Sequence, residues 1–252
     1  MELEWADLVE GSDKNAEDGA SDALDGISGA LRCSIMTKDG EQLVAILKRD
    51  PPEHVFAEAL CALLLNRWGL SVPRPFLVQE AGGVAFASAD MRYPNLKQKV
   101  GIDGEDQDPV EKEVATRLAV ELVSGFPTTN LALAIDEAID NRDRNLGNVL
   151  WDGIEETWID HAMSLGNALH MADCNKLCMI MTAAGKANEA KQAAITHWTA
   201  LNRSAIAPLA DKIDEHYDTA LWRDMILQRL DDLGSRIMAR FPQPDDLLAN
   251  LP

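Results

Sequence analysis

The chain has 252 residues, of which 46% are hydrophobic and 26% are charged, and its formal net charge is −19. This composition is that of a globular protein, and the charge disfavours direct binding to nucleic acid. No apolar run reaches about 18 residues and the chain begins with acidic residues, so neither a membrane span nor a signal peptide is predicted. We therefore expect a cytoplasmic protein.

The beginning of the chain is strongly acidic. Residues 1–25 carry nine acidic side chains against a single basic one, Lys14. Such a bias predicts a solvated, partly mobile head. An alternative is that this segment covers a basic partner or a site.

Residues 26–90 show the pattern of a small mixed lobe. Alternating apolar residues and turn signals predict strands, which we place at residues 30–36, 42–48, 76–78 and 84–87. Apolar positions at helical spacing predict a helix over residues 53–68, which Gly69 ends. The predicted order is strand, strand, helix, strand, strand.

The rest of the chain, residues 91–252, has a mainly helical pattern. Residues 91–108 are polar and predict a hinge or loop. Helices are then expected at residues 110–124, at 131–141 and repeatedly through 175–240. A hairpin is expected within residues 148–160, around the turn formed by Asp152 and Gly153.

Two polar residues in front of that hairpin could serve phosphoryl transfer, which needs a carboxylate near the attacking hydroxyl and ligands for Mg²⁺. Asp143 and Asn148 are five residues apart, and Asn148 directly precedes an apolar strand. Asp140 and Asn145 share this spacing, but Asp140 is predicted to lie on the preceding helix. We favour Asp143 and Asn148, although the spacing also fits a polar helix end.

Asp160 follows the second strand of the predicted hairpin. The hairpin would bring Asn148 and Asp160 side by side at one end, where an amide and a carboxylate could hold a hard metal ion. An aspartate that simply caps the strand is the alternative.

Lys48 and Glu58 form the third candidate pair. Lys48 ends a predicted strand, and Glu58 lies ten residues later in the next helix. A lysine in this place could hold ATP phosphates, and the glutamate could orient it. A surface lysine and a solvated acid would give the same pattern.

The order of these motifs resembles that of HipA-like bacterial kinases, with a weaker likeness to phosphoinositide kinases. The similarity rests on Asp143-Arg144-Asn145-Leu146-Gly147-Asn148-Val149-Leu150 and on Trp158-Ile159-Asp160-His161-Ala162. Glu58 in its helix and the passage Gly69-Leu70-Ser71-Val72-Pro73-Arg74-Pro75 are also similar. Asn145 stands where the family often has histidine, so we expect an altered but working loop.

The resemblance implies an α+β, two-lobed protein-kinase-like fold, with a small sheet-plus-helix N-lobe and a mainly helical C-lobe. It implies that Asp143 is the catalytic aspartate, that Asn148 and Asp160 bind Mg²⁺, and that Lys48 contacts the ATP phosphates with Glu58 as its partner. The adenine would meet the backbone near Ala85, Phe86, Ala87 and Ser88. A phosphate-covering loop would include Gly26, Ser28 and Gly29.

The predicted reaction is transfer of the γ-phosphoryl group of Mg-ATP to a Ser or Thr hydroxyl of a protein, which includes the chain itself. An antitoxin or another regulatory protein is a further partner that the resemblance implies. Two alternatives stay open: a kinase for a lipid or small molecule, and a pseudokinase that acts as an interaction module. A purely structural helical protein would require the motif order to be chance.

Overall fold

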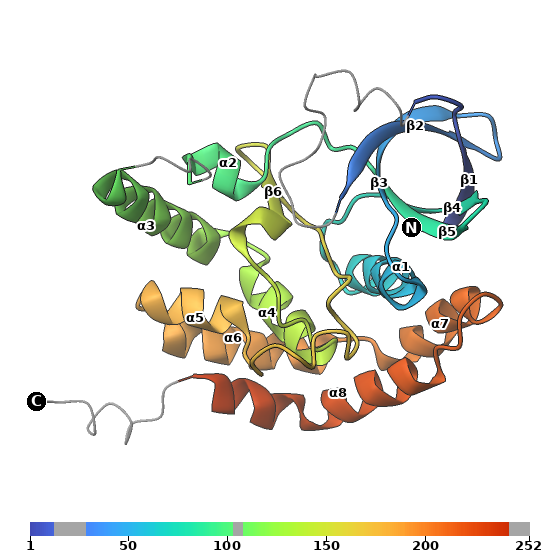
Figure 1. Ribbon diagram of the computed structural model, residues 1–252. Coiled ribbons are helices and arrows are strands. Elements are labelled where there is room, and N and C mark those ends of the chain that lie inside the picture. Colours follow the sequence, from blue (N-terminus) through green and yellow to red (C-terminus); the bar gives the residue numbers. More distant parts are fainter. Residues whose placement is uncertain (13–28, 103–107, 242–252) are drawn as a thin grey trace, which may run out of the picture. The chain divides into compact units, whose positions relative to one another are not determined.

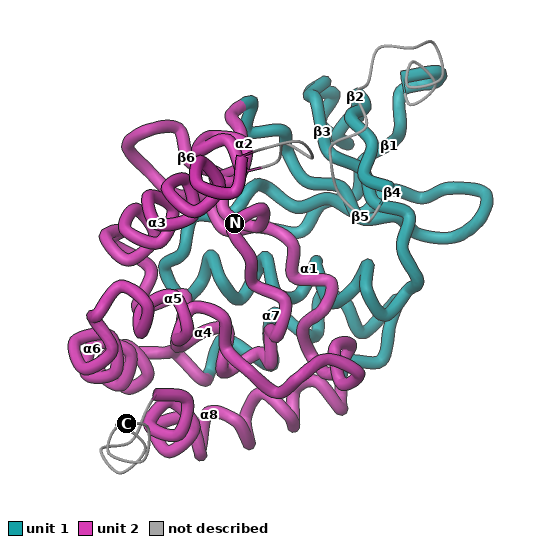
Figure 2. The backbone as a smooth tube through the Cα atoms, turned by 60° about the vertical axis from the view of Figure 1, so that its left-hand side comes forward, with its two compact units in different colours: residues 1–92, 204–219 teal, residues 93–203, 220–252 magenta. Residues whose placement is uncertain are grey.

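The computed structural model describes residues 1–12, 29–102 and 108–241 (Figure 1). The chain divides into two compact units (Figure 2). Unit 1 consists of residues 1–92 and 204–219, and unit 2 of residues 93–203 and 220–252. The first division lies close to the predicted end of the small lobe at residue 90. The return of residues 204–219 to unit 1 was not predicted.

A closed β-barrel forms the main part of unit 1 (Figure 1). Its strands are β1 (Glu4–Leu8), β2 (Leu31–Thr37), β3 (Gln42–Lys48), β4 (Pro75–Glu80) and β5 (Gly83–Ala89). Their order around the barrel is β1-β2-β3-β5-β4, and the neighbours are antiparallel except β1 and β4, which are parallel. The four strands predicted between residues 26 and 90 are thus present.

Strand β1 lies within the acidic segment of residues 1–25, where no strand was predicted. Residues 4–8 hydrogen-bond to β2 on one side and to β4 on the other, so they close the barrel. The side chain of Ala6 is buried in the barrel core, as the alternation of a strand requires. Residues 13–25 lie outside the described part of the chain.

Alternate side chains of each strand fill the barrel, and most of them are small. The interior of a narrow barrel is packed rather than hollow, so small side chains leave room for the larger Ile35, Leu47 and Phe76. The core consists of Ala6, Cys33, Ile35, Ala45, Leu47, Phe76, Val78, Ala85 and Ala87.

Helix α1 (Pro52–Arg67) is buried around its whole circumference. Every residue from Val55 to Leu65 is buried, which is typical of a helix that is covered on several sides. It packs against β4, β5 and α7 (Ile206–Asp214), and the ring of Phe56 stacks on Tyr217 with centroids 5.3 Å apart. The surroundings of α1 therefore leave Glu58 in an apolar setting.

Unit 2 is mainly helical, as predicted. Its helices are α2 (Leu96–Val100), α3 (Pro109–Gly125), α4 (Thr129–Ala138), α5 (Lys176–Ala183), α6 (Ala187–Ala200) and α8 (Ala220–Arg240). Helix α4 is central and packs against α5, α6 and α8. The predicted loop over residues 91–108 contains α2, whose start is fixed by a capping box between Asn95 and Gln98.

The predicted hairpin is confirmed. It consists of β6 (Val149–Trp151) and β7 (Glu156–Trp158), with Val149 opposite Trp158.

Over the described residues, no single helix is both long and apolar enough to cross a membrane, although α3 and α4, bent by 87° relative to each other, meet that test as a pair.

Candidate active site

The first candidate pair, Lys48 and Glu58, is brought together within unit 1. Leu47 points into the barrel, so Lys48 points outward from β3. Its Nζ lies 2.5 Å from Oε1 of Glu58 on α1, and the two side chains are 12% and 2% exposed. A carboxylate buried on an apolar helix needs a nearby cation, and Lys48 supplies it.

This pair gives a first prediction. Lys48→Met should lower the free energy of unfolding by about 1–3 kcal/mol, because Glu58 would stay buried without that cation. The loss is limited because the side chain of Lys48 is partly exposed to water in the wild type. Urea denaturation measures the loss. Lys48→Met combined with Glu58→Leu should recover part of it, and a double variant that is less stable than the single one would contradict this account.

The second group lies in the loop that follows α4. Asp140 has a left-handed backbone (φ 57°) and is 4% exposed, between the guanidinium groups of Arg142 and Arg229. The hydrogen bond to Asp140 raises the pKa of Arg142. Asp143, in contrast, is 34% exposed. Of the two possible aspartates, Asp143 is the one that an external group can reach. Asp140 is buried and paired with arginines.

The buried side chain of Arg144 holds this loop in place. Its guanidinium is 1% exposed and donates two hydrogen bonds to Asp136 of α4, at 3.0 and 2.8 Å. It also donates to the carbonyl oxygen of Ile159 at 2.7 Å and lies over the ring of Trp158. One buried arginine therefore connects α4, the loop that carries Asp143 and the end of the hairpin.

The amide side chains of the loop complete its geometry. Asn145 accepts a hydrogen bond from the backbone N–H of Gly147 and donates to the carbonyl oxygen of Asp143. Asn148 donates to the same carbonyl oxygen through Nδ2 at 3.1 Å. Both amides therefore bond within the loop, and the amide oxygen of Asn148 is the atom that it can offer to a metal ion.

Asp160 lies next to Asn148, because the backbone N–H of Ile159 donates to the carbonyl oxygen of Asn148 at 3.1 Å. Asp160 adopts a left-handed backbone conformation (φ 63°). Residues other than glycine rarely adopt it, and such residues are concentrated at functional sites. The hairpin thus brings Asn148 and Asp160 to the same end.

These two side chains suit Mg²⁺. They offer oxygen atoms, which Mg²⁺ prefers, and this ion often uses only one or two protein ligands together with water and phosphate oxygens. Across the part of the chain that the structure describes, no group of three or more His, Cys, Asp or Glu side chains could hold a metal ion. A metal ion here would therefore rely on Asn148, Asp160 and the oxygens of its substrate.

The residues predicted to meet the adenine lie in strand β5. Phe86, Ala87 and Ser88 lie in β5, which pairs with β3 on one side and β4 on the other. Phe86, Ala87 and Ser88 have a strand partner on both sides, whereas Ala85 is paired with β4 alone, and contact with adenine stays a prediction. The side chains of Ala85 and Ala87 are in the barrel core.

The predicted phosphate-covering loop is described only in part. Gly26 and Ser28 lie outside the described residues, whereas Gly29 has a left-handed backbone (φ 58°) with open space around its Cα. Such a position can bend sharply.

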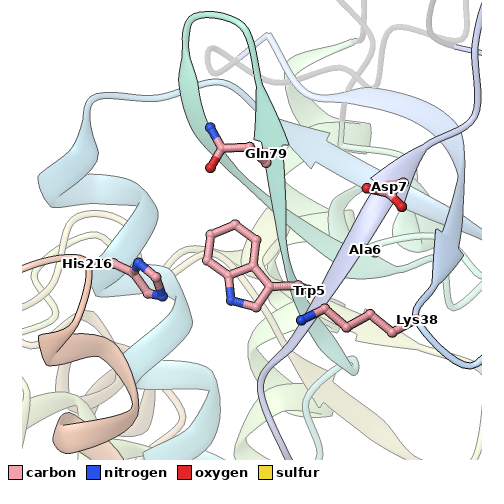
Figure 3. Close-up of a pocket in the computed structure, with 6 residues that line it drawn as sticks. All are labelled: Trp5, Ala6, Asp7, Lys38, Gln79 and His216. Atoms are coloured by element: carbon pink, nitrogen blue, oxygen red, sulfur yellow. The ribbon is translucent and has the colours of Figure 1, made fainter.

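Unit 1 also has a pocket of about 340 Å³ (Figure 3). It is lined by Trp5, Ala6, Asp7, Lys38, Gln79 and His216. The rings of Trp5 and His216 meet edge to face, with centroids 4.9 Å apart. None of the predicted site residues lines this pocket, so its volume says nothing about the candidate chemistry.

No protein-family model matches the chain, and no curated protein does either. Among solved structures, the chain is similar to the proinflammatory kinase CtkA of Helicobacter pylori, with a TM-score of 0.53 and 14% identity over 87% of this chain and 95% of that one. It is also similar to Shewanella oneidensis HipA, solved with HipB and operator DNA. That match has a TM-score of 0.55 and 13% identity over 87% of this chain and 65% of HipA.

The chain has the fold of HipA-like kinases. This confirms the predicted resemblance at the level of the fold, because identities of 13% and 14% carry no more than that. The chain spans about two thirds of the length of the Shewanella HipA structure and nearly all of CtkA.

Sequence reasoning missed three charged residues of this site. Asp136 and Arg144 form a buried pair, and Lys176 lies 2.7 Å from Asp143. Arg144 is part of the recognised motif, but nothing in the motif indicates its partner. Lys176 stands 33 residues after Asp143, where no spacing rule connects the two.

Proposed function

We propose that this chain is a kinase that transfers the γ-phosphoryl group of Mg-ATP to a Ser or Thr hydroxyl of a protein, its own chain included. The observation that supports it best is the connection made by Arg144, which ties the Asp143 loop to the hairpin that carries Asn148 and Asp160. These three side chains have the chemistry that the reaction needs, and the fold is that of kinases.

Each residue has a separate role in this proposal. Asp143 accepts a hydrogen bond from the acceptor hydroxyl and takes its proton. Asn148 and Asp160 would hold Mg²⁺, which when bound offsets the negative charge of the phosphates. Lys48, kept in place by Glu58, donates to the phosphates of ATP. Catalysis then comes from position and charge rather than from a covalent intermediate.

A regulatory protein partner belongs to the same proposal. It is supported by the Shewanella HipA structure, in which HipA was solved with HipB and operator DNA. The net charge of −19 makes a protein a more suitable partner for this chain than nucleic acid.

The proposal is tested by following labelled γ-phosphate from Mg-ATP to protein, with Asp160→Asn beside the wild type. The wild type should transfer label. Asp160→Asn should raise the Mg²⁺ concentration for half-maximal rate at least about tenfold, because one charged metal ligand is lost. Asp152→Asn, an exposed substitution at the turn of the same hairpin, serves as the control and should behave as the wild type.

Thermal melting with and without Mg-ATP separates the alternatives. A ligand that binds the folded state raises the melting temperature. If the wild type is stabilised by Mg-ATP but transfers label to no protein, a pseudokinase or a kinase for a lipid or small molecule replaces the proposal. If it is not stabilised and transfers nothing, the fold is that of a kinase but the proposed reaction is wrong.

A further inference from the structure

The carboxylate of Asp143 is held by a lysine from a distant part of the chain. Nζ of Lys176, the first residue of α5, lies 2.7 Å from Oδ1 of Asp143. The two side chains are 33% and 34% exposed, so the pair is open to solvent, unlike the nearby pair of Asp136 and Arg144. An incoming substrate can therefore reach both charges.

The backbone that carries Lys176 is firmly placed. Asn175 precedes it and is 3% exposed. Its side chain accepts hydrogen bonds from the N–H groups of Leu177 and Cys178 and donates to the carbonyl oxygen of Leu133 on α4. Lys176 thus starts from a point fixed to the same helix that anchors Arg144.

The other cations of this loop are already engaged. Arg144 donates hydrogen bonds to Asp136 and to the carbonyl oxygen of Ile159. Arg142 donates hydrogen bonds to Asp140 and to the carbonyl oxygen of Met171. The ammonium group of Lys176 has three N–H donors. Asp143 takes one of them, so donors remain for a second, negatively charged group beside this carboxylate.

We propose that Lys176 is a catalytic residue, whose ammonium group donates hydrogen bonds to the non-bridging oxygens of the phosphoryl group during its transfer. This inference rests on the proposed function. The acceptor oxygen forms a bond to the γ-phosphorus, and its proton passes to the carboxylate of Asp143. The bond from the γ-phosphorus to the β–γ bridging oxygen breaks, and its electron pair leaves with ADP.

A cation beside Asp143 reduces the electrostatic repulsion between this carboxylate and the phosphoryl group. A phosphoryl group that approaches Asp143 brings negative charge toward a carboxylate, in a protein of net charge −19. The ammonium group already in contact with Asp143 reduces that repulsion and can follow the charge as it moves. Because this contact is strongest in the transition state, it should affect kcat more than KM for ATP.

The test compares Lys176→Met and Lys176→Arg with the wild type in the full chain, using labelled ATP and its γ-thio analogue. Lys112→Met is the matched control, since Lys112 is an exposed lysine on α3 of the same unit. Lys176→Met should lower kcat about 10²- to 10³-fold, the usual effect of losing one such donor, with little change in KM for ATP. Lys176→Arg should restore part of the rate.

The γ-thio analogue gives a readout that a purely structural role would not change. Sulfur accepts hydrogen bonds weakly, so the wild type should lose more rate on the analogue than Lys176→Met does. A Lys176→Met variant that is faster than the wild type would make the ion pair an inhibitory contact and overturn the inference. Equal thio effects, or an unchanged kcat, would overturn it as well, whereas a wild type without transfer would overturn the proposed function itself.

Discussion

Asp143→Asn is expected to slow phosphoryl transfer about 10²- to 10⁴-fold, the range typical of a lost general base. Asparagine has nearly the same shape and can still accept a hydrogen bond from Lys176, but it takes no proton from the acceptor hydroxyl. Stability should change little, because Asp143 is about one third exposed. Initial rates of label transfer at saturating Mg-ATP measure the effect.

Asp140→Asn is the matched comparison, because Asp140 and Asn145 form the rival pair with the same spacing. Asparagine tolerates the left-handed backbone at this position, so the loop can keep its path. We expect Asp140→Asn to lower stability through the loss of charge beside Arg142 and Arg229. A folded Asp140→Asn protein without transfer, beside an active Asp143→Asn protein, would reverse the assignment.

Arg144→Met is expected to lower the free energy of unfolding by about 3–5 kcal/mol. The carboxylate of Asp136 would stay in the interior without its cation, and both partners are 1% exposed in the wild type. The carbonyl oxygen of Ile159 would also lose its donor. Chemical denaturation followed by circular dichroism measures the change, and Arg142→Met shows how much a neighbouring, less buried arginine contributes.

A second substitution separates stability from function at this position. Arg144→Met with Asp136→Leu removes both charges, so part of the stability should return. Transfer of phosphate should not return, because the double variant still lacks the hydrogen bond from Arg144 to the carbonyl oxygen of Ile159 beside Asp160. If the double variant is fully active, or if Arg144→Met loses less than about 1 kcal/mol, Arg144 does not have the anchoring role described above.

The hairpin and its flanking residues could be predicted because their signals are local. One short stretch of the chain contains Asn148, the turn at Asp152 and Asp160. The pairing of β6 with β7 brings the two ends of this stretch together. The partner of Lys48 could also be predicted, from a resemblance. The partners of Asp143 and Arg144 could not, since the choice of one lysine or one aspartate depends on helix packing rather than on spacing.

Strand β1 and the position of β5 show a second limit. The acidic residues around Trp5 and Ala6 do not indicate a strand. The partners of this strand, β2 and β4, come much later in the chain. The alternation of β5 predicts a strand but not its neighbours. Its place between β3 and β4 depends on pairing with separate parts of the chain, which the alternation does not reveal.

The discontinuity of unit 1 has a consequence for how the protein is made. As the chain leaves the ribosome, β1 must wait for β4 before the barrel can close, and α1 must wait for α7 before its apolar surface is covered. The larger part of unit 2, residues 93–203, is therefore synthesised while unit 1 still exposes apolar side chains. A fragment that stops at Arg92 would keep that surface exposed, which favours aggregation. No single cut in the gene would release unit 1 as an intact folding unit.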